Sequence, residues 1–318
     1  MSIFSTTLNQ MLYLFIFILI GFLLAHFKVV NKEAAGILGK FENSVFIPAL
    51  VMGTFIDNFT VSQLDSTWKL MVFSLLLELI VIPLAFLGAK LCTRDIDKRK
   101  ICIYGLSFSN FSFMGNAIVN AIFPEIFLQY IIFTLVLWAM IYVWAVPTLL
   151  VCPENGAKMT FRQRLRGFAN PMFICMIIGM VIGLLEIKLP VYVSSVIDAA
   201  GSCMSPVAML LTGITVAGLN FKKLFADAGV YFITVLRLIV FPIAFMFGLI
   251  FVARFIPLTD VMIICGVCSV AMPLGLNTIV IPSAYGKDTT SATAMALVSH
   301  TASVITIPLI FMLLQKFL

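Results

Sequence analysis

Long apolar runs recur from one end of the chain to the other, separated by short polar or basic loops. An α-helix needs roughly 20 apolar residues to cross a hydrocarbon core about 30 Å thick. Ten segments pass this test, at about residues 8–28, 34–56, 68–91, 101–123, 127–150, 170–188, 194–219, 228–251, 260–285 and 290–315. Almost nothing is left over for a soluble domain.

The composition agrees with a membrane protein. Hydrophobic residues fill 62% of the 318 positions and charged residues only 11%, far from the usage of soluble domains. Helices satisfy their own backbone groups in lipid, and the short alternating strands of a barrel are not evident. We therefore predict an all-α integral membrane protein. No lysine or arginine precedes the first apolar run, so we expect that helix to stay in the mature protein.

Basic residues gather in alternate loops. Fourteen lie on one side, namely Lys28, Lys32, Lys90, Arg94, Lys98, Arg99, Lys100, Lys158, Arg162, Arg164, Arg166, Lys222, Lys223 and Lys287. The other side holds Lys69, Lys188, Arg254 and Lys316. Because such residues stay preferentially in the cytoplasm, we predict a cell (inner or plasma) membrane protein with both termini outside the cytoplasm. The net charge of +6 is then a topology signal, and no nucleic-acid partner is expected.

The sequence contains an internal repeat. ELIVIPLAF at 78–86 returns as RLIVFPIAF at 237–245. Prolines keep the register, since Pro48, Pro83 and Pro147 match Pro206, Pro242 and Pro308 at spacings of 158, 159 and 161. Further matches pair Gly21 with Gly179, Ser44 with Ser202, and Asn116 with Asn277. We interpret the chain as two copies of five helices.

An odd number of helices per copy makes the second copy enter the membrane from the opposite face. The predicted fold is therefore ten transmembrane helices in two inverted five-helix repeats, at 1–152 and 169–318, joined by a basic cytoplasmic linker at 153–168. Inverted repeats of this kind are typical of secondary transporters, whose sites lie near the midplane where helices are interrupted.

The best candidate interruption is in the ninth segment, where Pro273, Gly275 and Pro282 surround Asn277. A proline removes one amide donor and clashes with the preceding turn. The fourth segment offers the matching polar positions Asn110, Ser112, Gly115, Asn116 and Asn120. If both helices break and cross, their half-helix N-termini would attract an anion. Ordinary kinks with small packing residues are the alternative.

Three stretches carry a resemblance to a known family: IGFLLAHFKVVNKEAAGILGKFENSVFIPALVMGTF, AMPLGLNTIVIPSAYGKD and SVITIPLIF. They resemble the auxin efflux carriers of bacteria, which are relatives of plant PIN-type carriers and, more distantly, of the bile acid sodium symporters. The resemblance covers essentially the whole chain. It implies crossing helices four and nine, a scaffold of helices one, two, six and seven, and a transport domain of helices three to five and eight to ten.

The resemblance also implies where substrate binds. Carried over by position, the crossing corresponds to Gly115, Asn116, Pro273, Gly275 and Asn277. Family members often have a proline at both crossings, and this chain lacks one at 115–117. Characterised bacterial relatives are associated with small carboxylates such as malate and malonate, and asparagine NH₂ groups donate hydrogen bonds to a carboxylate without adding a full charge. Wall residues would be Asn43, Ser44, Ser202 and Ser205, or these are packing aids.

Glu42, Glu78 and Arg237 are charged residues well inside predicted spans, where charges are expensive and usually functional. Glu78 and Arg237 occupy matching repeat positions, and the resemblance implies that both belong to one transport domain, so we expect them to neutralise each other as an ion pair. Alternatively, Arg237 attracts the substrate anion or Glu78 takes part in proton coupling. Glu42 is either a coupling carboxylate or a member of a local polar network with Lys40 and Asn43.

Other motifs favour no further chemistry. Cys265 and Cys268 form a CxxC inside an apolar span, which is unsuited to a redox site, and His300 is interpreted as a packed histidine bonded to a neighbouring helix. No metalloprotease, nucleophile-elbow or phosphate-loop motif is present, so no enzyme activity, metal or cofactor is expected.

The predicted function is secondary transport of a small organic anion, a mono- or dicarboxylate such as malate or an auxin-like acid. An anion channel and a non-transporting membrane sensor are the alternatives. The expected partners are the lipid bilayer and the anion, with H⁺ or Na⁺ as the ion if transport is coupled; the resemblance also implies a second copy of the chain. Uniport and exchange are open as well.

Overall fold

The computed structural model describes residues 3–31, 33–59, 64–151, 169–218, 227–284, 287 and 289–317. The basic linker expected at 153–168 lies outside these residues. The described residues form helices joined by short non-helical segments, with one isolated bridge between Ser109 and Leu274. This confirms the all-α class.

The first half of the described chain contains ten helical elements. They are α1 (Ile3–His26), α2 (Glu33–Phe41), η1 (Glu42–Phe46), α3 (Ile47–Asn58), α4 (Leu64–Cys92), α5 (Ile96–Ser107), α6 (Gly115–Ile122), η3 (Pro124–Ile126), α7 (Phe127–Met140) and η4 (Ile141–Leu150).

The second half of the described chain contains eight helical elements. Its elements are α9 (Pro171–Leu184), α10 (Val191–Val216), α12 (Ala228–Val235), η6 (Leu236–Val240), α13 (Phe241–Val252), α14 (Asp260–Ala271), α15 (Asn277–Ala284) and α16 (Thr290–Gln315). Among the described residues, seven helices are long and apolar enough to cross a membrane, counting α2 to α3, η3 to η4 and α12 to α13 as continuous. Two more, α9 and α14, are apolar but shorter.

Three elements are π-turns, and each lies next to or around a proline of the repeat. The turn η1 precedes Pro48, η6 precedes Pro242, and η4 contains Pro147. Proline lacks the backbone N–H and crowds the preceding turn, which widens the helix there instead of ending it. These helices therefore continue through their prolines.

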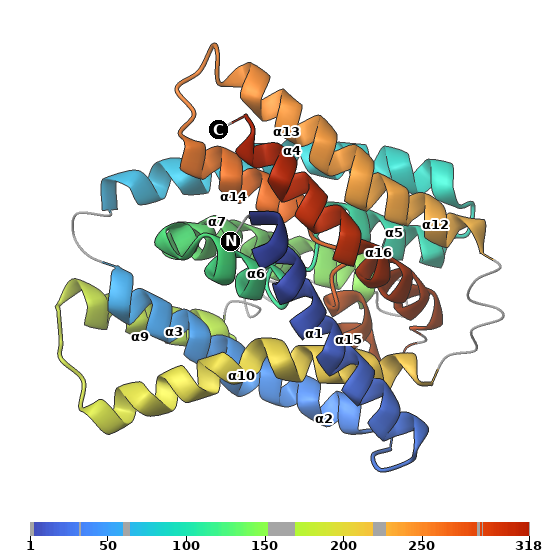
Figure 1. Cartoon of the computed structure of the whole chain (residues 1–318), viewed down its shortest axis with the longest axis horizontal. Helices are drawn as coiled ribbons and strands as arrows, with labels where there is room; N and C mark the ends of the chain where they lie inside the picture. The colour runs from blue at the N-terminus through green and yellow to red at the C-terminus, as the bar shows by residue number, and fades with distance from the viewer. Residues whose placement is uncertain are drawn as a thin grey trace.

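The helices pack in two groups. In one group α10 contacts α1, α2 and α3, and α3 contacts α9; in the other, α4 contacts α5, α7 and α12, and α14 contacts α7 and α13. Figure 1 shows α2, α3, α9 and α10 together along one side of the molecule, with α4, α12 and α13 along the opposite side. The helix α1 slants between them and contacts both α10 and α16.

Glycines allow the closest approaches in the first group. A Cβ added at Gly179 of α9 would lie 2.7 Å from the Met52 carbonyl oxygen of α3. A Cβ at Gly21 of α1 would collide with the Leu210 carbonyl oxygen of α10. Small residues at helix interfaces in membranes let backbones pack directly, so these contacts explain two glycines of the repeat.

Candidate functional site

Two helices are interrupted, and the interruptions lie against each other. The first break separates α5, which ends at Ser107, from α6, which begins at Gly115; the second separates α14, which ends at Ala271, from α15 at Asn277. Ser109 pairs with Leu274 in an antiparallel bridge, and the Asn110 N–H donates to the Pro273 carbonyl at 2.7 Å. The breaks therefore cross, as the sequence predicts.

The second break follows from its own residues. Pro273 cannot donate to the helical ladder, and its carbonyl accepts the hydrogen bond from Asn110 instead. A Cβ at Gly275 would lie 3.0 Å from the carbonyl oxygens of both Phe108 and Ser109, so the crossing needs a bare backbone there. Pro282, by contrast, lies inside α15 and causes no interruption.

The first break has no proline, and side chains from other elements hold it open. The Tyr130 hydroxyl of α7 donates to the Phe111 carbonyl at 2.9 Å. Ser205 of α10 donates to the Phe113 carbonyl at 3.1 Å, and Ser109 of the break itself donates to the Ser269 carbonyl of α14 at 2.5 Å. These bonds satisfy backbone groups that the missing helical turn leaves free. The first break thus interrupts its helix as completely as the second break does, although it lacks a proline.

The Arg237 side chain forms hydrogen bonds beside both breaks. Its guanidinium group, on η6, is 1% exposed and donates to the carbonyls of Leu106 at 2.6 Å, Ser269 at 3.1 Å and Met272 at 3.1 Å. Leu106 lies in the last turn of α5, Ser269 lies in the last turn of α14, and Met272 directly follows α14. A helix C-terminus carries partial negative charge and free carbonyls, both of which a cation stabilises. One arginine therefore caps both half-helices.

The expected ion pair between Glu78 and Arg237 is not formed. Both residues are described, and their charged groups are not within ion-pair distance, because the guanidinium donates to backbone carbonyls instead. Glu78 is buried, and its Oε1 has no hydrogen-bond partner. The interpretation of Arg237 as a direct partner of Glu78 is corrected to that of a helix cap.

Asn116 and Asn277 lie in the first turns of the second half-helices, α6 and α15. Their side chains are 4% and 6% exposed, and the Asn116 Oδ1 has no hydrogen-bond partner. The buried Tyr104 hydroxyl approaches the Asn277 amide without reaching hydrogen-bond geometry. Both amide groups therefore lie at the positive N-terminal ends of the half-helices that follow the breaks.

Asn110 and Ser112 lie within the first break and are buried. The Asn110 Nδ2 lies 2.9 Å from the His300 Nε2, and the His300 Nδ1 lies 2.7 Å from the Ala296 carbonyl. A carbonyl can only accept, so Nδ1 carries the proton and Nε2 accepts from Asn110. His300 is a packed histidine bonded to a neighbouring element, as expected.

Two of the predicted wall residues lie elsewhere. Ser44 and Ser202 are exposed and form no hydrogen bond to either break; Ser202 donates to the Asp198 carbonyl of its own helix. Asn43 is half-buried and donates to Gly39 at 2.8 Å. Of the four residues, Ser205 alone reaches a break by a hydrogen bond.

No group of three potential ligands for a metal is found among the described residues. Cys265 and Cys268 are fully buried inside α14. The crossing can therefore offer neutral hydrogen-bond donors and positive helix ends, a combination suited to holding a small anion reversibly.

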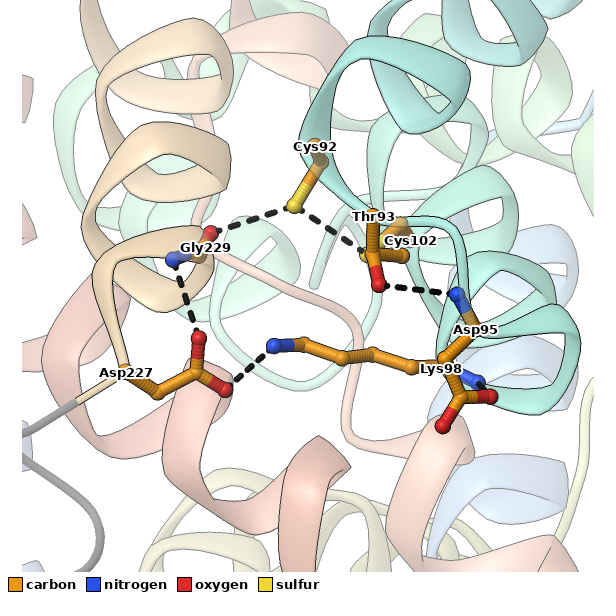
Figure 2. A network of polar contacts seen from close by, with 7 residues as sticks. All are labelled: Cys92, Thr93, Asp95, Lys98, Cys102, Asp227 and Gly229. Carbon is orange, nitrogen blue, oxygen red and sulfur yellow. Dashed lines mark hydrogen bonds and ion pairs between the residues drawn. The ribbon is translucent and has the colours of Figure 1, made fainter.

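A second polar network ties the two halves of the sequence together at the start of α12. Figure 2 shows Lys98 of α5 reaching Asp227, which caps α12 by accepting from the Gly229 N–H at 3.0 Å. Cys92 Sγ lies 3.4 Å from the Gly229 oxygen and 3.8 Å from Cys102 Sγ. This network fixes the ends of α4, α5 and α12 together.

The sequence indicated the crossing but not what supports it. Tyr130, Ser109 and the capping role of Arg237 gave no signal, because each acts through a partner from another part of the chain. The buried charge at Arg237 marked an important position, although its partners were unpredictable from spacing.

The helices and the crossed breaks define a multi-pass membrane protein with a buried polar centre. A family model described as membrane transport protein matches residues 6–164 and 157–311, nearly the whole chain. The chain belongs to this family, that of the auxin efflux carriers. Among curated proteins, no match to the chain was found.

Proposed function

We propose that this chain is a secondary transporter that carries a small organic anion across the membrane by alternating access. The observation that carries the proposal is the crossing itself. Asn116 lies in the first turn of α6 and Asn277 begins α15, the two breaks before these half-helices contact each other, and Arg237 caps the two preceding half-helices. Negative helix ends are thereby neutralised while positive ends stay available for an anion.

Reciprocal contacts support the inverted ten-helix repeat. Gly21 packs on Leu210, and Gly179 packs on Met52. Adding the repeat spacing of 158 converts Gly21 to Gly179 and Met52 to Leu210, so the two contacts are equivalent by the repeat. A chance similarity between apolar helices would not produce matched contacts of this kind.

The packing groups support the proposed division into scaffold and transport domain. We assign α1 to α3, α9 and α10 to the scaffold, and the elements from α4 to η4 and from α12 to α16 to the transport domain. The breaks belong to the transport domain and contact the scaffold through Ser205. Movement of one group against the other would carry the crossing between the two membrane faces.

The proposed topology places two basic loops on the cytoplasmic side: the one that contains Lys98, and the one that contains Lys222 and Lys223 shortly before Asp227. Contact between these residues agrees with loops that share one side. Both termini would then face away from the cytoplasm in a cell membrane.

A carboxylate is the anion class that the crossing fits best. The site offers amide donors and helix N-termini, and no cation is left free, because Arg237 is bonded to carbonyls. Neutral donors hold a carboxylate without the cost of removing a full opposite charge from water. Release to the second side is then possible, as transport requires.

The test is uptake of labelled malate by liposomes that contain the purified chain and unlabelled malate. Membrane potential, a proton gradient and a sodium gradient are imposed one at a time. We expect saturable uptake, counterflow and a response to one gradient. Non-saturating flux without counterflow would identify a channel instead. Absence of flux with malate and with a panel of mono- and dicarboxylates, including an auxin-like acid, would contradict the proposal.

A further inference from the structure

Glu42 is a buried carboxyl group outside the hydrogen bonds of the crossing. It begins the π-turn η1, it is 1% exposed, and neither carboxyl oxygen has a hydrogen-bond partner. The Ala208 N–H approaches it without reaching hydrogen-bond geometry. A π-turn within a helix often marks a functional site, and an unpaired buried carboxylate is costly in apolar surroundings. The group therefore needs an explanation.

The local polar network that the sequence allowed is not present. Asn43 donates to the Gly39 carbonyl, and no ion pair joins Lys40 to Glu42 among the described residues. The titratable or charged side chains on α2 and on the elements packed against α2 and η1 do not line its pocket; these are Glu33, Lys40, Asp57, Cys175, Tyr192, Asp198 and Cys203. No positive group thus compensates a charge on Glu42.

The pocket beside Glu42 lies where the two packing groups meet. Its other lining residues are Gly39, Phe113, Ala208, Leu211 and Leu276. Phe113 belongs to the first break and Leu276 to the second, whereas Ala208 and Leu211 belong to α10. Both breaks thus close over the carboxyl group.

The chemistry of the pocket selects its occupant. The space is too small for a water molecule, and no lining residue other than Glu42 carries a side-chain oxygen. A sodium ion needs several oxygen ligands, whereas a proton needs only the carboxylate. Protonation also removes the uncompensated charge.

We propose that Glu42 is a proton-binding site of the transport cycle. It holds a proton while both breaks press against η1 and α10, and it exchanges that proton with water when the breaks move away. The proton joins a carboxylate oxygen from water on one side of the membrane and returns to water on the other. This inference rests on the proposed function, because it requires the breaks to move.

Infrared difference spectroscopy of the purified protein at neutral pH tests the protonation without any substrate. The expected result is a protonated-carboxyl band that is present in the wild type and in Glu33→Gln, and lost in Glu42→Gln. Glu33 is a matched control because it is an exposed glutamate on the same helix. An identical band in wild type and Glu42→Gln would overturn the proposal. If Glu42→Gln does not insert, Glu42→Met, which suits an apolar pocket, replaces it.

Malate uptake by liposomes tests the coupling. We expect a pH gradient to accelerate uptake by the wild type and by Glu33→Gln, with loss of this acceleration but not of malate counterflow in Glu42→Gln. A full response to the gradient in Glu42→Gln, or no response in the wild type, would overturn coupling through Glu42. Absence of wild-type malate flux would instead count against the proposed function, and the infrared band would still decide the protonation of Glu42.

Discussion

The second break contains a proline and a glycine of its own, whereas the first break, residues 108–114, contains neither. Pro273 and Gly275 interrupt the helix between α14 and α15 directly. The first break instead depends on hydrogen bonds from Tyr130, Ser205 and Arg237 to its carbonyls or to the helix end beside it.

The difference teaches that equivalent positions of a repeat can reach similar geometry by different means. A break made by proline persists whatever surrounds it, because the proline ring removes the backbone N–H permanently. A break held by distant side chains depends on their staying in place. Variants of these side chains should therefore separate the two breaks, whereas Arg237 should affect both.

The largest effect is expected for Arg237→Met. It leaves the buried carbonyls of Leu106 and Met272 without a side-chain donor, and it removes one of the two side-chain donors to the Ser269 carbonyl. Each unsatisfied buried group costs about 1 to 3 kcal/mol, so a loss of about 3 kcal/mol or more is expected. Thermal unfolding in detergent measures this loss of stability. Arg237→Lys keeps the charge but not the fork of donors, so its unfolding temperature should lie between those of the wild type and Arg237→Met. An unfolding temperature like that of the wild type would refute the double cap.

Gly275→Ala should be next. The added Cβ would lie 3.0 Å from two carbonyl oxygens of the first break and push the breaks apart. Overpacking of this kind costs about 1 to 3 kcal/mol. The control is Gly248→Ala, because a Cβ at Gly248 of α13 meets nothing within 4 Å. Equal unfolding temperatures for the two variants would argue against close contact at the crossing.

Tyr130→Phe isolates the first break. It removes one hydrogen bond, to the Phe111 carbonyl, and keeps the ring in place. We expect a loss of about 1 kcal/mol. Hydrogen exchange should rise at 108–114 and stay unchanged at 272–276. Equal increases in both segments would mean that the breaks are not supported separately.

Glu78→Gln should have the smallest effect. Glu78 forms no ion pair with Arg237, so replacing its carboxyl group by a neutral amide removes no ion pair. A change in unfolding free energy of less than about 1 kcal/mol is expected, whereas breaking a buried ion pair costs about 3 to 5 kcal/mol. A loss in that larger range would restore the pairing hypothesis.

The sequence was sufficient for the all-α class and for the place of the second break. Apolar length predicted the segments, and Pro273 with Gly275 predicted the second break, because both signals are local. The supports of the first break were not predictable, since Ser205 and Phe113 are far apart in sequence and meet only by packing. Depth in the membrane suggested that Glu78 and Arg237 would pair, but depth does not determine which way a side chain turns.

The ten-span inverted topology and the residues of the anion site stay predictions. Ser44 and Ser202 illustrate the limit of the repeat as a guide: they match in register, yet both are exposed. Polar character at matched positions indicates symmetry more reliably than it indicates a binding role.

Labelled malate uptake by Asn116→Ala and Asn277→Ala tests the anion site at the crossing most directly. Asn120→Ala is the control, because Asn120 is exposed on the same helix as Asn116. A hydrogen bond to a charged group contributes about 1.5 to 3 kcal/mol, so each site variant should lower uptake about tenfold or more, with Asn120→Ala unchanged. Normal uptake by both site variants, correctly inserted in the membrane, would contradict an anion site at the crossing.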